Sequence, residues 1–532
     1  MQRLRKAAQK EHNMKLNYKR TILVGFAFFL ICAFWQAYDN TIPLILTNKF
    51  GMKQTWSGFI MALDNILALF LLPLFGSLSD RSTSRFGRRT PFIVAGTLVA
   101  VVAFVGLSFV DAAQLRHLSE VSAIDDPVAM QTIYAAEQDQ SLLTPEGDSF
   151  VLSEMYTAEE FSAIQSQITE GDSTITNPDY TNYVVPARQA YAWQTTAESP
   201  STLIFFIILL LIVLVSMAIA RSPAVALMPD VTIKPLRSKA NAVINLMGSA
   251  GGILVLILGM VFATSAVRNS LMSYVGYFST IALIMIIALA IFLLTVREPI
   301  FVADMHKESE RYGLLEDADP AEDHEHKKLG ASERTSLLLI LSSIVLWFMG
   351  YNAITSKYSV YASNILHKDY NFTLIIAQAA AIISYLPVGI IASKIGRKKT
   401  IIAGVIMLTA AFTAGIFMRA DSPTLIMNCI FALAGIAWAT INVNSFPMVV
   451  EMCSGGDVGK YTGYYYSASM AAQVVTPVFS GYLMDKLGMT SLFPYAAIFT
   501  GLAFFTMLFV RHGDSKPEAK HGLDALEDMD SD

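Results

Sequence analysis

The chain has 532 residues, of which 54% are hydrophobic and only 15% are charged, and its mean hydropathy is +0.48. This composition is too apolar for a water-soluble chain of that length and excludes ordinary soluble enzymes and binding domains. The formal net charge is only −5. We expect the protein to be embedded in the lipid bilayer and to bind no nucleic acid.

Apolar residues are gathered into runs long enough to cross a membrane. A bilayer core about 30 Å thick needs roughly 20 consecutive, mostly apolar helical residues. The pattern predicts an all-α membrane protein with twelve transmembrane helices in two six-helix bundles, residues 21–296 and 336–510. The twelve expected spans are 21–46, 58–79, 90–110, 201–221, 240–264, 274–296, 336–362, 372–393, 400–418, 424–449, 463–484 and 490–510.

Charged segments separate and flank these bundles. Residues 297–335 are too charged to span a membrane and should link the bundles in the cytoplasm. Lys and Arg accumulate in the basic tail 1–20 and in alternate loops, which predicts a cell-membrane protein with both termini in the cytoplasm. The basic tail does not resemble a signal peptide, because the apolar run after it is too long and lacks a small-residue cleavage site. Residues 511–532 form an acidic tail.

Residues 111–199 form a long extracytoplasmic insertion, rich in Asp and Glu, between the third and fourth spans. Loops of this length are usually functional or disordered. We expect either a small cap over the outer mouth or a flexible solvated segment, with a short amphipathic helix near 157–168. The three cysteines, Cys32, Cys429 and Cys453, lie in or beside spans and predict no disulfide framework.

The sequence lacks the motifs of energising enzymes and of resident metal sites. It has no GxxxxGK[ST] phosphate loop, no HExxH and no CxxC, and its histidines fall in loops, tails or span ends. His324 and His326, in the acidic linker, are typical of a solvated segment rather than of a metal site. We therefore expect no enzymatic activity, no metal and no cofactor, with a proton as the coupling ion.

The most informative motif follows the second span and reads GSLSDRSTSRFGRRTPFIVAG from Gly76 to Gly96. It places an acid at the cytoplasmic end of one helix and several arginines in the short loop before the next. An ion pair between the acid and an arginine that forms in only one transport state would stabilise that state. Alternatively, the arginines only mark the cytoplasmic side of the membrane. A reduced copy, GIIASKIGRKKT, follows the eighth span at 389–400, which suggests parallel repeats. The predicted gate residues in the first loop are Asp80, Arg81, Arg85, Gly87, Arg88 and Arg89.

This loop resembles the G-x-x-x-D-R-x-G-R-[KR] pattern of the major facilitator superfamily. The stretch SDRSTSRFGRRTPFI resembles the sucrose/proton symporters and, more distantly, the glycoside, pentoside and hexuronide cation symporters such as melibiose permease. A second stretch after the fourth span, RSPAVALMPDVTIKPLRSKANAV at 221–243, is similar to the same group and adds Asp230 and Arg237 to the predicted gate. The resemblance implies the major facilitator fold and proton-linked uptake of a sugar.

Two departures from the family pattern concern the coupling ion. Melibiose-type symporters carry two acids on the second helix at positions that are Leu72 and Ala68 in this chain, so a sodium site of that kind is not expected. The helix-four acid of the plant sucrose carriers is replaced by Leu214. Any proton carrier must therefore lie elsewhere in the chain.

Two acids inside the spans are candidates for proton coupling, because ionisable residues in a bilayer are costly. Asp39 in the first span and Asp64 in the second share a depth on adjacent, oppositely running helices. Close carboxylates would share a proton. Alternatively, Asn40, Asn65 or backbone donors satisfy these acids, which then serve only helix packing. Lys357, near the outer end of the seventh span, either pairs with Asp39 as an outer gate or extends to the membrane interface.

A solute cavity between the two halves should be lined by amides, hydroxyls and aromatic rings, which suit neutral hydroxylated ligands. Any single buried amide could equally hold two helices together. The candidates for this cavity are Trp35, Gln36, Tyr38, Asn40, Asn65, Asn245, Tyr351, Asn352, Gln378, Trp438, Asn442, Asn444 and Gln473.

The sequence thus predicts a secondary active transporter, a monomeric proton-coupled symporter of a sugar or glycoside that works by alternating access. One alternative is a major facilitator carrier of another small solute, such as an amino acid, a lysolipid or a drug. The other is a non-transporting membrane receptor that binds its ligand through the insertion.

Overall fold

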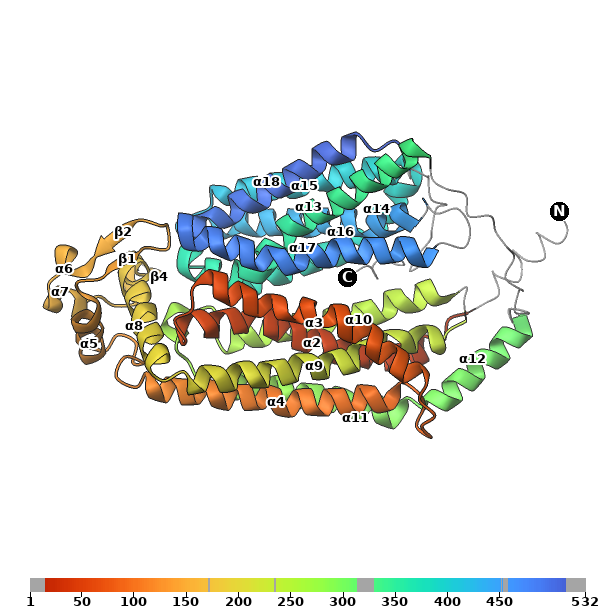
Figure 1. The fold of residues 1–532 in the computed structure, drawn as a ribbon, viewed down its shortest axis with the longest axis horizontal. Helices are drawn as coiled ribbons and strands as arrows, with labels where there is room; N and C mark the ends of the chain where they lie inside the picture. Colours follow the sequence, from red (N-terminus) through yellow and green to blue (C-terminus); the bar gives the residue numbers. More distant parts are fainter. Residues whose placement is uncertain are drawn as a thin grey trace.

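The computed structural model describes residues 15–170, 173–233, 236–312, 330–450, 452 and 458–512. Long helices run side by side in two groups, and a small domain caps one end of them (Figure 1). We call the end that carries this domain the insertion end. The opposite end, where α12 (Glu298–Tyr312) lies, is called the linker end.

The first group of helices comes from the first half of the chain. Its apolar core includes the rings of Phe34, Phe104 and Phe278, of which the last two stack with centroids 4.2 Å apart. The helices are α2 (Tyr18–Asn48), α3 (Gln54–Asp80), α4 (Thr90–His117), α9 (Ser201–Asp230), α10 (Arg237–Val261) and α11 (Val275–Thr295).

The second group has its own apolar core, in which Trp347, Phe348 and Tyr358 are buried. Its helices are α13 (Ala331–Tyr361), α14 (Tyr370–Ile395), α15 (Arg397–Ile416), α16 (Thr424–Val450), α17 (Val458–Leu487) and α18 (Leu492–Leu508). Short helical turns connect some of the long helices: η3 (Val267–Asn269), η4 (Ala362–Leu366) and η5 (Met489–Ser491).

In the part of the chain that the structure describes, ten helices are long and apolar enough to cross a membrane. Neither α14 nor α17 is among the ten, and only Tyr370–Tyr385 of α14 forms a shorter apolar helix. Both nevertheless run alongside the others through the second group (Figure 1). The chain is therefore a multi-pass membrane protein whose spans are helical, as its composition predicts, but the expected all-α class is wrong for the insertion, which adds four short β-strands.

The two groups pack closely where glycines remove the side chain from a helix surface. A Cβ atom on Gly58 of α3 would overlap the carbonyl oxygen of Pro477 on α17, and one on Gly481 of α17 would overlap that of Gln54. These backbone-to-backbone approaches join α3 to α17 toward the insertion end. They require glycine at both positions, because any larger residue would force the helices apart.

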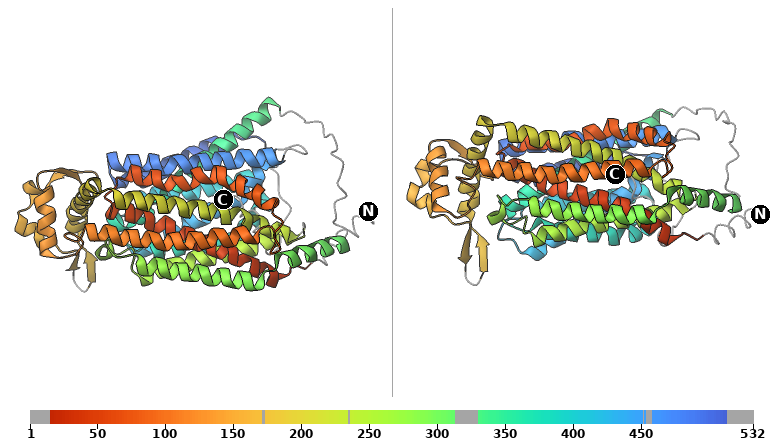
Figure 2. Two further views of the ribbon diagram at one scale, coloured as in Figure 1. Left: turned by 60° about the horizontal axis from the view of Figure 1, so that its bottom comes forward. Right: turned by 90° about the horizontal axis from the view of Figure 1, so that it is seen from below.

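The insertion is a folded domain rather than a flexible segment. Met130, Ile133, Phe161, Tyr180 and Val184 are fully buried in its own apolar core. Two antiparallel hairpins pair β1 with β2 and β3 with β4. Its elements are α5 (Pro127–Glu137), β1 (Ser141–Leu143), β2 (Ser149–Val151), α6 (Leu152–Met155), α7 (Ala158–Ser162), β3 (Gln167–Glu170), β4 (Ser173–Thr176), η1 (Tyr180–Val184) and α8 (Val185–Glu198). Of the two expectations for this segment, the cap agrees with the structure (Figure 2).

Three local expectations need adjustment. The helix near 157–168 is only the short α7, which a capping box between Thr157 and Glu160 begins, because residues 167–170 pair as β3 instead. The fourth span extends to Asp230, beyond the end of the apolar run. The linker 297–335 opens with the helix α12. His324, His326 and Cys453 lie outside the described residues.

Candidate functional site

The two acids proposed for proton coupling lie in one small cavity. Asp39 of α2 and Asp64 of α3 both line a space of 110 Å³, which we call the acid cavity. The amide of Asn65 donates to Oδ1 of Asp64 at 2.8 Å. Asn352 of α13 and Gln473 of α17 line the same space from the second half. Ion pairs in the described part of the chain include neither acid.

A larger cavity lies between the halves next to the acid cavity. This central cavity has a volume of 340 Å³, and its polar lining includes Gln36, Asp39 and Asn40 of the first half and Tyr351, Gln378 and Trp438 of the second. The rings of Tyr351 and Trp438 stack at 3.6 Å between centroids and 4° between planes. The amide of Gln378 donates to Oε1 of Gln36 at 2.5 Å and so bridges the two halves. Asp39 and Thr355 line both cavities.

Two of the lining amides have unused donors. The side-chain nitrogens of Asn40 and Asn352 are buried, and neither finds a hydrogen-bond partner in the described part of the chain. Buried polar groups are nearly always bonded, so an unpaired donor beside a cavity indicates a place for water or for a ligand. Asn40 lies on the central cavity and Asn352 on the acid cavity.

Five of the expected cavity residues line neither space. Tyr38 is buried among core aromatic rings and packs beside Phe34 and Trp35, which explains its position by helix packing. The amide of Asn444 donates to the carbonyl oxygen of Thr440 at 3.0 Å, within its own helix. The five residues are Trp35, Tyr38, Asn245, Asn442 and Asn444.

The structure adds Arg221 to this region, a residue that sequence reasoning missed. Its charge acts on both Asp39 and Asp64, and its guanidinium lies 5.9 Å from the ring centroid of Trp35. The apolar run of the fourth span stops at Arg221, which therefore looked like a residue at the helix end. Because α9 continues to Asp230, Arg221 instead lies inside the bundle. The continued apolar character of the PAVALM stretch was the available signal.

Lys357 bonds the first half at a different place from the one expected. Its ammonium donates to the carbonyl oxygen of Gln54 at 2.8 Å rather than to Asp39. Asp485 of α17 accepts hydrogen bonds from the backbone N–H groups of Gln54 and Thr55, both at 2.8 Å, and from the Thr55 hydroxyl. Two second-half residues thus hold the first turn of α3, and we call Gln54, Thr55, Lys357 and Asp485 the insertion-end lock. Neither alternative for Lys357 describes this structure, because the fully buried ammonium binds a backbone carbonyl that no sequence pattern reveals, instead of Asp39 or the membrane interface.

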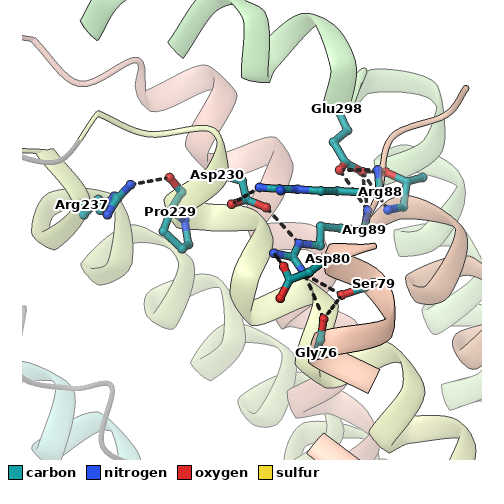
Figure 3. Close-up of polar contacts among 10 residues, drawn as sticks. Gly76, Ser79, Asp80, Arg88, Arg89, Pro229, Asp230, Arg237 and Glu298 are labelled. Atoms are coloured by element: carbon teal, nitrogen blue, oxygen red, sulfur yellow. Dashed lines mark hydrogen bonds and ion pairs between the residues drawn. The ribbon is translucent and has the colours of Figure 1, made fainter. Parts of the chain in front are cut away.

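The predicted gate motif forms a network at the linker end (Figure 3). Asp230 at the end of α9 accepts from Arg88 at 2.8 Å and from Arg89 at 2.9 Å. Arg89 also pairs with Asp80 at the end of α3 and donates to the Ser79 hydroxyl at 2.5 Å. The guanidinium of Arg89, which is almost completely buried, therefore ties α3, α4 and α9 together.

Glu298 at the start of α12 completes this network and was not predicted. Its carboxylate accepts from the backbone N–H groups of Arg88, Arg89 and Thr90 at 2.8–2.9 Å, and so caps the first turn of α4. An acid at a helix N-terminus satisfies donors that would otherwise be unpaired. Gly87 has a φ of 108°, and a Cβ there would overlap the Glu298 carboxylate. Glu298 stands 208 residues from Thr90 in sequence, which is why no local pattern could reveal the contact.

The remaining gate residues take less central positions. Arg81 and Arg85 are exposed, and Arg85 lies 4.8 Å from the ring centroid of Phe86. Arg237 donates to the carbonyl oxygen of Pro229 (Figure 3) and to that of Thr232 rather than to an acid. Among the described residues, the ion pairs of this cluster join elements of the first half, so these pairs stabilise that bundle.

The matching loops of the two halves share a glycine with a positive φ. Gly396 has a φ of 95° immediately before α15, and Gly87, with a φ of 108°, lies in the loop just before α4. Both loops therefore turn into the next helix through a left-handed glycine. The shared turn agrees with the internal repeat that the sequence suggests.

Family comparisons agree with this architecture. The profile described as MFS_1 like family matches residues 25–369, and the profile described as Major Facilitator Superfamily matches residues 358–525. Together they cover both helix groups. The resemblance noted in the sequence is thereby confirmed.

Individual relatives match over short stretches. Sucrose transport protein SUC4 of Arabidopsis thaliana is 43% identical over 51 residues, 10% of each chain. Proton-associated sugar transporter A of Homo sapiens is 37% identical over 94 residues, 18% of this chain and 11% of the relative. The chain thus matches about a tenth of the length of these curated relatives.

Solved structures match the whole fold at low identity. An inward-open structure of the xylose transporter XylE from E. coli has a TM-score of 0.55 at 15% identity, covering 96% of this chain and 98% of that one. A bacterial homologue of the iron transporter ferroportin, in an inward-facing state, has a TM-score of 0.57 at 12% identity, covering 93% and 99%. Likeness at this level shows a shared fold and leaves the solute open.

Proposed function

Because the chain belongs to the major facilitator superfamily, we propose that it is a secondary active transporter that takes up a saccharide together with a proton. In this proposal twelve helices cross the cell membrane, the insertion end faces outward, and the linker end and both termini face the cytoplasm. The two helix groups alternate access to the central cavity.

The chemistry of the central cavity supports a neutral, hydroxylated solute. Tyr351 and Trp438 present a stacked aromatic surface, and Gln36, Asn40 and Gln378 supply amide donors and acceptors in the same cavity. Sugar rings combine apolar faces with hydroxyl edges, and a pocket of this kind satisfies both. The volume of 340 Å³ lies in the range of small-molecule sites. The names of the sucrose and proton-associated sugar transporter relatives support the same class.

The observation that carries the proposal is that Asp39 lines both cavities. A carboxylate that faces the solute space and also faces a second acid can change its protonation when solute enters. Asp39, Asp64 and Arg221 form a group with two acids and one cation. Full ionisation would leave one buried negative charge without a partner, which is costly in a membrane, and binding a proton removes that cost. A solute hydroxyl that bonds Asp39 would then couple solute binding to proton binding.

Uptake into proteoliposomes tests this proposal. Purified protein should accumulate at least one mono- or disaccharide from a panel when the outside is made acidic, and should only equilibrate it without the gradient. The variant Asn40→Ala, which removes an unpaired donor from the central cavity, should weaken uptake, whereas Asn444→Ala, which alters an amide outside both cavities, should not. Absence of uptake for every saccharide, with uptake of an amino acid instead, would contradict the solute class. Accumulation of the saccharide that does not depend on the pH gradient would contradict proton coupling.

A further inference from the structure

The insertion is fixed to the first helix group. α8 rests directly on the turn between α2 and α3, where Gly51 has a φ of 65° and has no room for a Cβ against the backbone of Gln189 and Trp193. The amide of Gln189 donates to Oδ1 of Asn48 at 3.0 Å, and the amide of Gln114 on α4 donates to the Thr196 hydroxyl at 3.0 Å. These contacts make the insertion move with the first group.

One arm of the insertion reaches across to the second group. The loop of the β1–β2 hairpin, residues 144–148, lies against the turn between α17 and α18. The backbone N–H of Met489 donates to the carbonyl oxygen of Pro145 at 2.7 Å. Gly147 and Gly488, with φ of 102° and 87°, face each other so closely that a Cβ on Gly488 would overlap the carbonyl oxygen of Glu146. Two glycines in opposed turns thus allow backbone to meet backbone.

This contact and the insertion-end lock border the same space. A cavity of 510 Å³ is lined by Gln54 and Asp485 of the lock and by residues of the hairpin loop, including Pro145 and Gly147. The hairpin therefore closes the far side of a vestibule whose inner side is closed by the lock. Both connect the first group to the second at the insertion end, where the two groups must separate whenever the central cavity opens to that side.

We propose that the hairpin loop 144–148 is a latch that holds the insertion end closed by binding the α17–α18 turn, and that it must release before this end opens. The inference uses the alternating-access part of the proposed function but depends on neither the solute nor the proton. A contact present only in the closed arrangement stabilises that arrangement by its own net free energy. Loss of one backbone hydrogen bond with its packing should therefore raise the ratio of open to closed molecules on the order of fivefold.

Met489→Pro tests the latch directly, because proline lacks the backbone N–H that Met489 donates to Pro145 and is compatible with the backbone at this position. Met489 is the first residue of η5, where proline is well tolerated, and the preceding Gly488 has an extended ψ of 161°. Met489→Ala is the matched control, since it shortens the same side chain and keeps the N–H. A second variant replaces residues 144–148 with an Asn-Gly turn, which preserves the pairing of Leu143 with Ser149 and removes the latch.

Distances between spin labels at positions 56 and 486 report the opening. Both residues are exposed, one at the start of α3 and the other at the end of α17, and the labels are placed after Cys32, Cys429 and Cys453 are replaced by Ser. We expect Met489→Pro and the shortened hairpin to enlarge the long-distance population of the full-length protein in lipid nanodiscs about fivefold over Met489→Ala. Distance distributions that superimpose for Met489→Pro, the shortened hairpin and Met489→Ala would overturn the proposal that the hairpin loop is a latch. Solute uptake is not read in this experiment, so failure of the saccharide proposal would leave its result intact.

Discussion

Asp485 offers the sharpest test of how the insertion end stays closed. Its carboxylate accepts three hydrogen bonds from the first turn of α3, two of them from backbone N–H groups at 2.8 Å. Asp485→Asn removes the negative charge and one of the two acceptor oxygens at almost constant volume. The helix N-terminus then loses its anionic cap, and at least one donor from the other half loses its partner.

The size of the effect follows from those bonds. A hydrogen bond to a charged group contributes about 1.5–3 kcal/mol net, and the variant keeps at most part of this set. We therefore expect the closed arrangement to lose about 2 kcal/mol relative to the open one, which is roughly a 30-fold change in the open-to-closed ratio. Lys357, which bonds the Gln54 carbonyl, remains in place and prevents complete opening.

Accessibility of the central cavity provides the assay. Thr355 lines both cavities, so a Thr355→Cys substitution in a background without native cysteines reports entry of a membrane-impermeant maleimide from the insertion end. Asp485→Asn should speed labelling about 30-fold. Lys486→Gln is the matched control, because it changes an exposed charge next to Asp485 and should leave the rate unchanged. Equal labelling rates for Asp485→Asn and the unmodified lock would refute the reasoning.

Three further predictions concern stability and binding. Asp111→Asn should destabilise the protein by about 3–5 kcal/mol, since it strands the fully buried Lys49 that pairs with Asp111 at 2.5 Å. The double variant Lys49→Met/Asp111→Leu should have an unfolding temperature close to that of the native protein. A loss of stability equal to the sum of the two single-variant losses would contradict the pairing. Burial raises the pKa of Glu137 in the insertion from 4.5 to about 7, so its folded state keeps a proton that the unfolded state releases. The insertion should therefore become less stable as pH rises from about 4.5 to 7, and limited proteolysis should show this loss in the native protein and not in Glu137→Gln. Asn40→Ala should weaken solute affinity about tenfold, whereas Asn444→Ala should leave it unchanged in a binding titration.

Features carried by local pattern could be predicted from the sequence. Long apolar runs fix where helices form, because a bilayer requires continuous apolar segments. The loop motif around Asp80 and Arg89 identified a real ion-pair cluster, since its residues are close in sequence. Asp39 and Asp64 could be placed at one depth by helix geometry alone, and they do share a cavity.

Features that depend on contacts between distant parts of the chain could not be predicted from the sequence. Glu298 caps α4 from the start of the linker, and Lys357 bonds a backbone carbonyl on α3, and neither partner leaves a sequence signal. Amide side chains were equally ambiguous, because rotation about the helix axis decides whether an Asn faces a cavity or its own helix. Asn352 and Asn444 illustrate the two outcomes.

Solute-driven proton movement tests the central claim, that Asp39 joins the solute space to a proton site. Proteoliposomes without an imposed gradient are given the transported saccharide on the outside, and the external pH is recorded. The native protein should alkalinise the medium as solute enters. Asp39→Asn should abolish this alkalinisation while still exchanging labelled for unlabelled solute. Alkalinisation by Asp39→Asn at the native ratio of protons to solute would contradict the account.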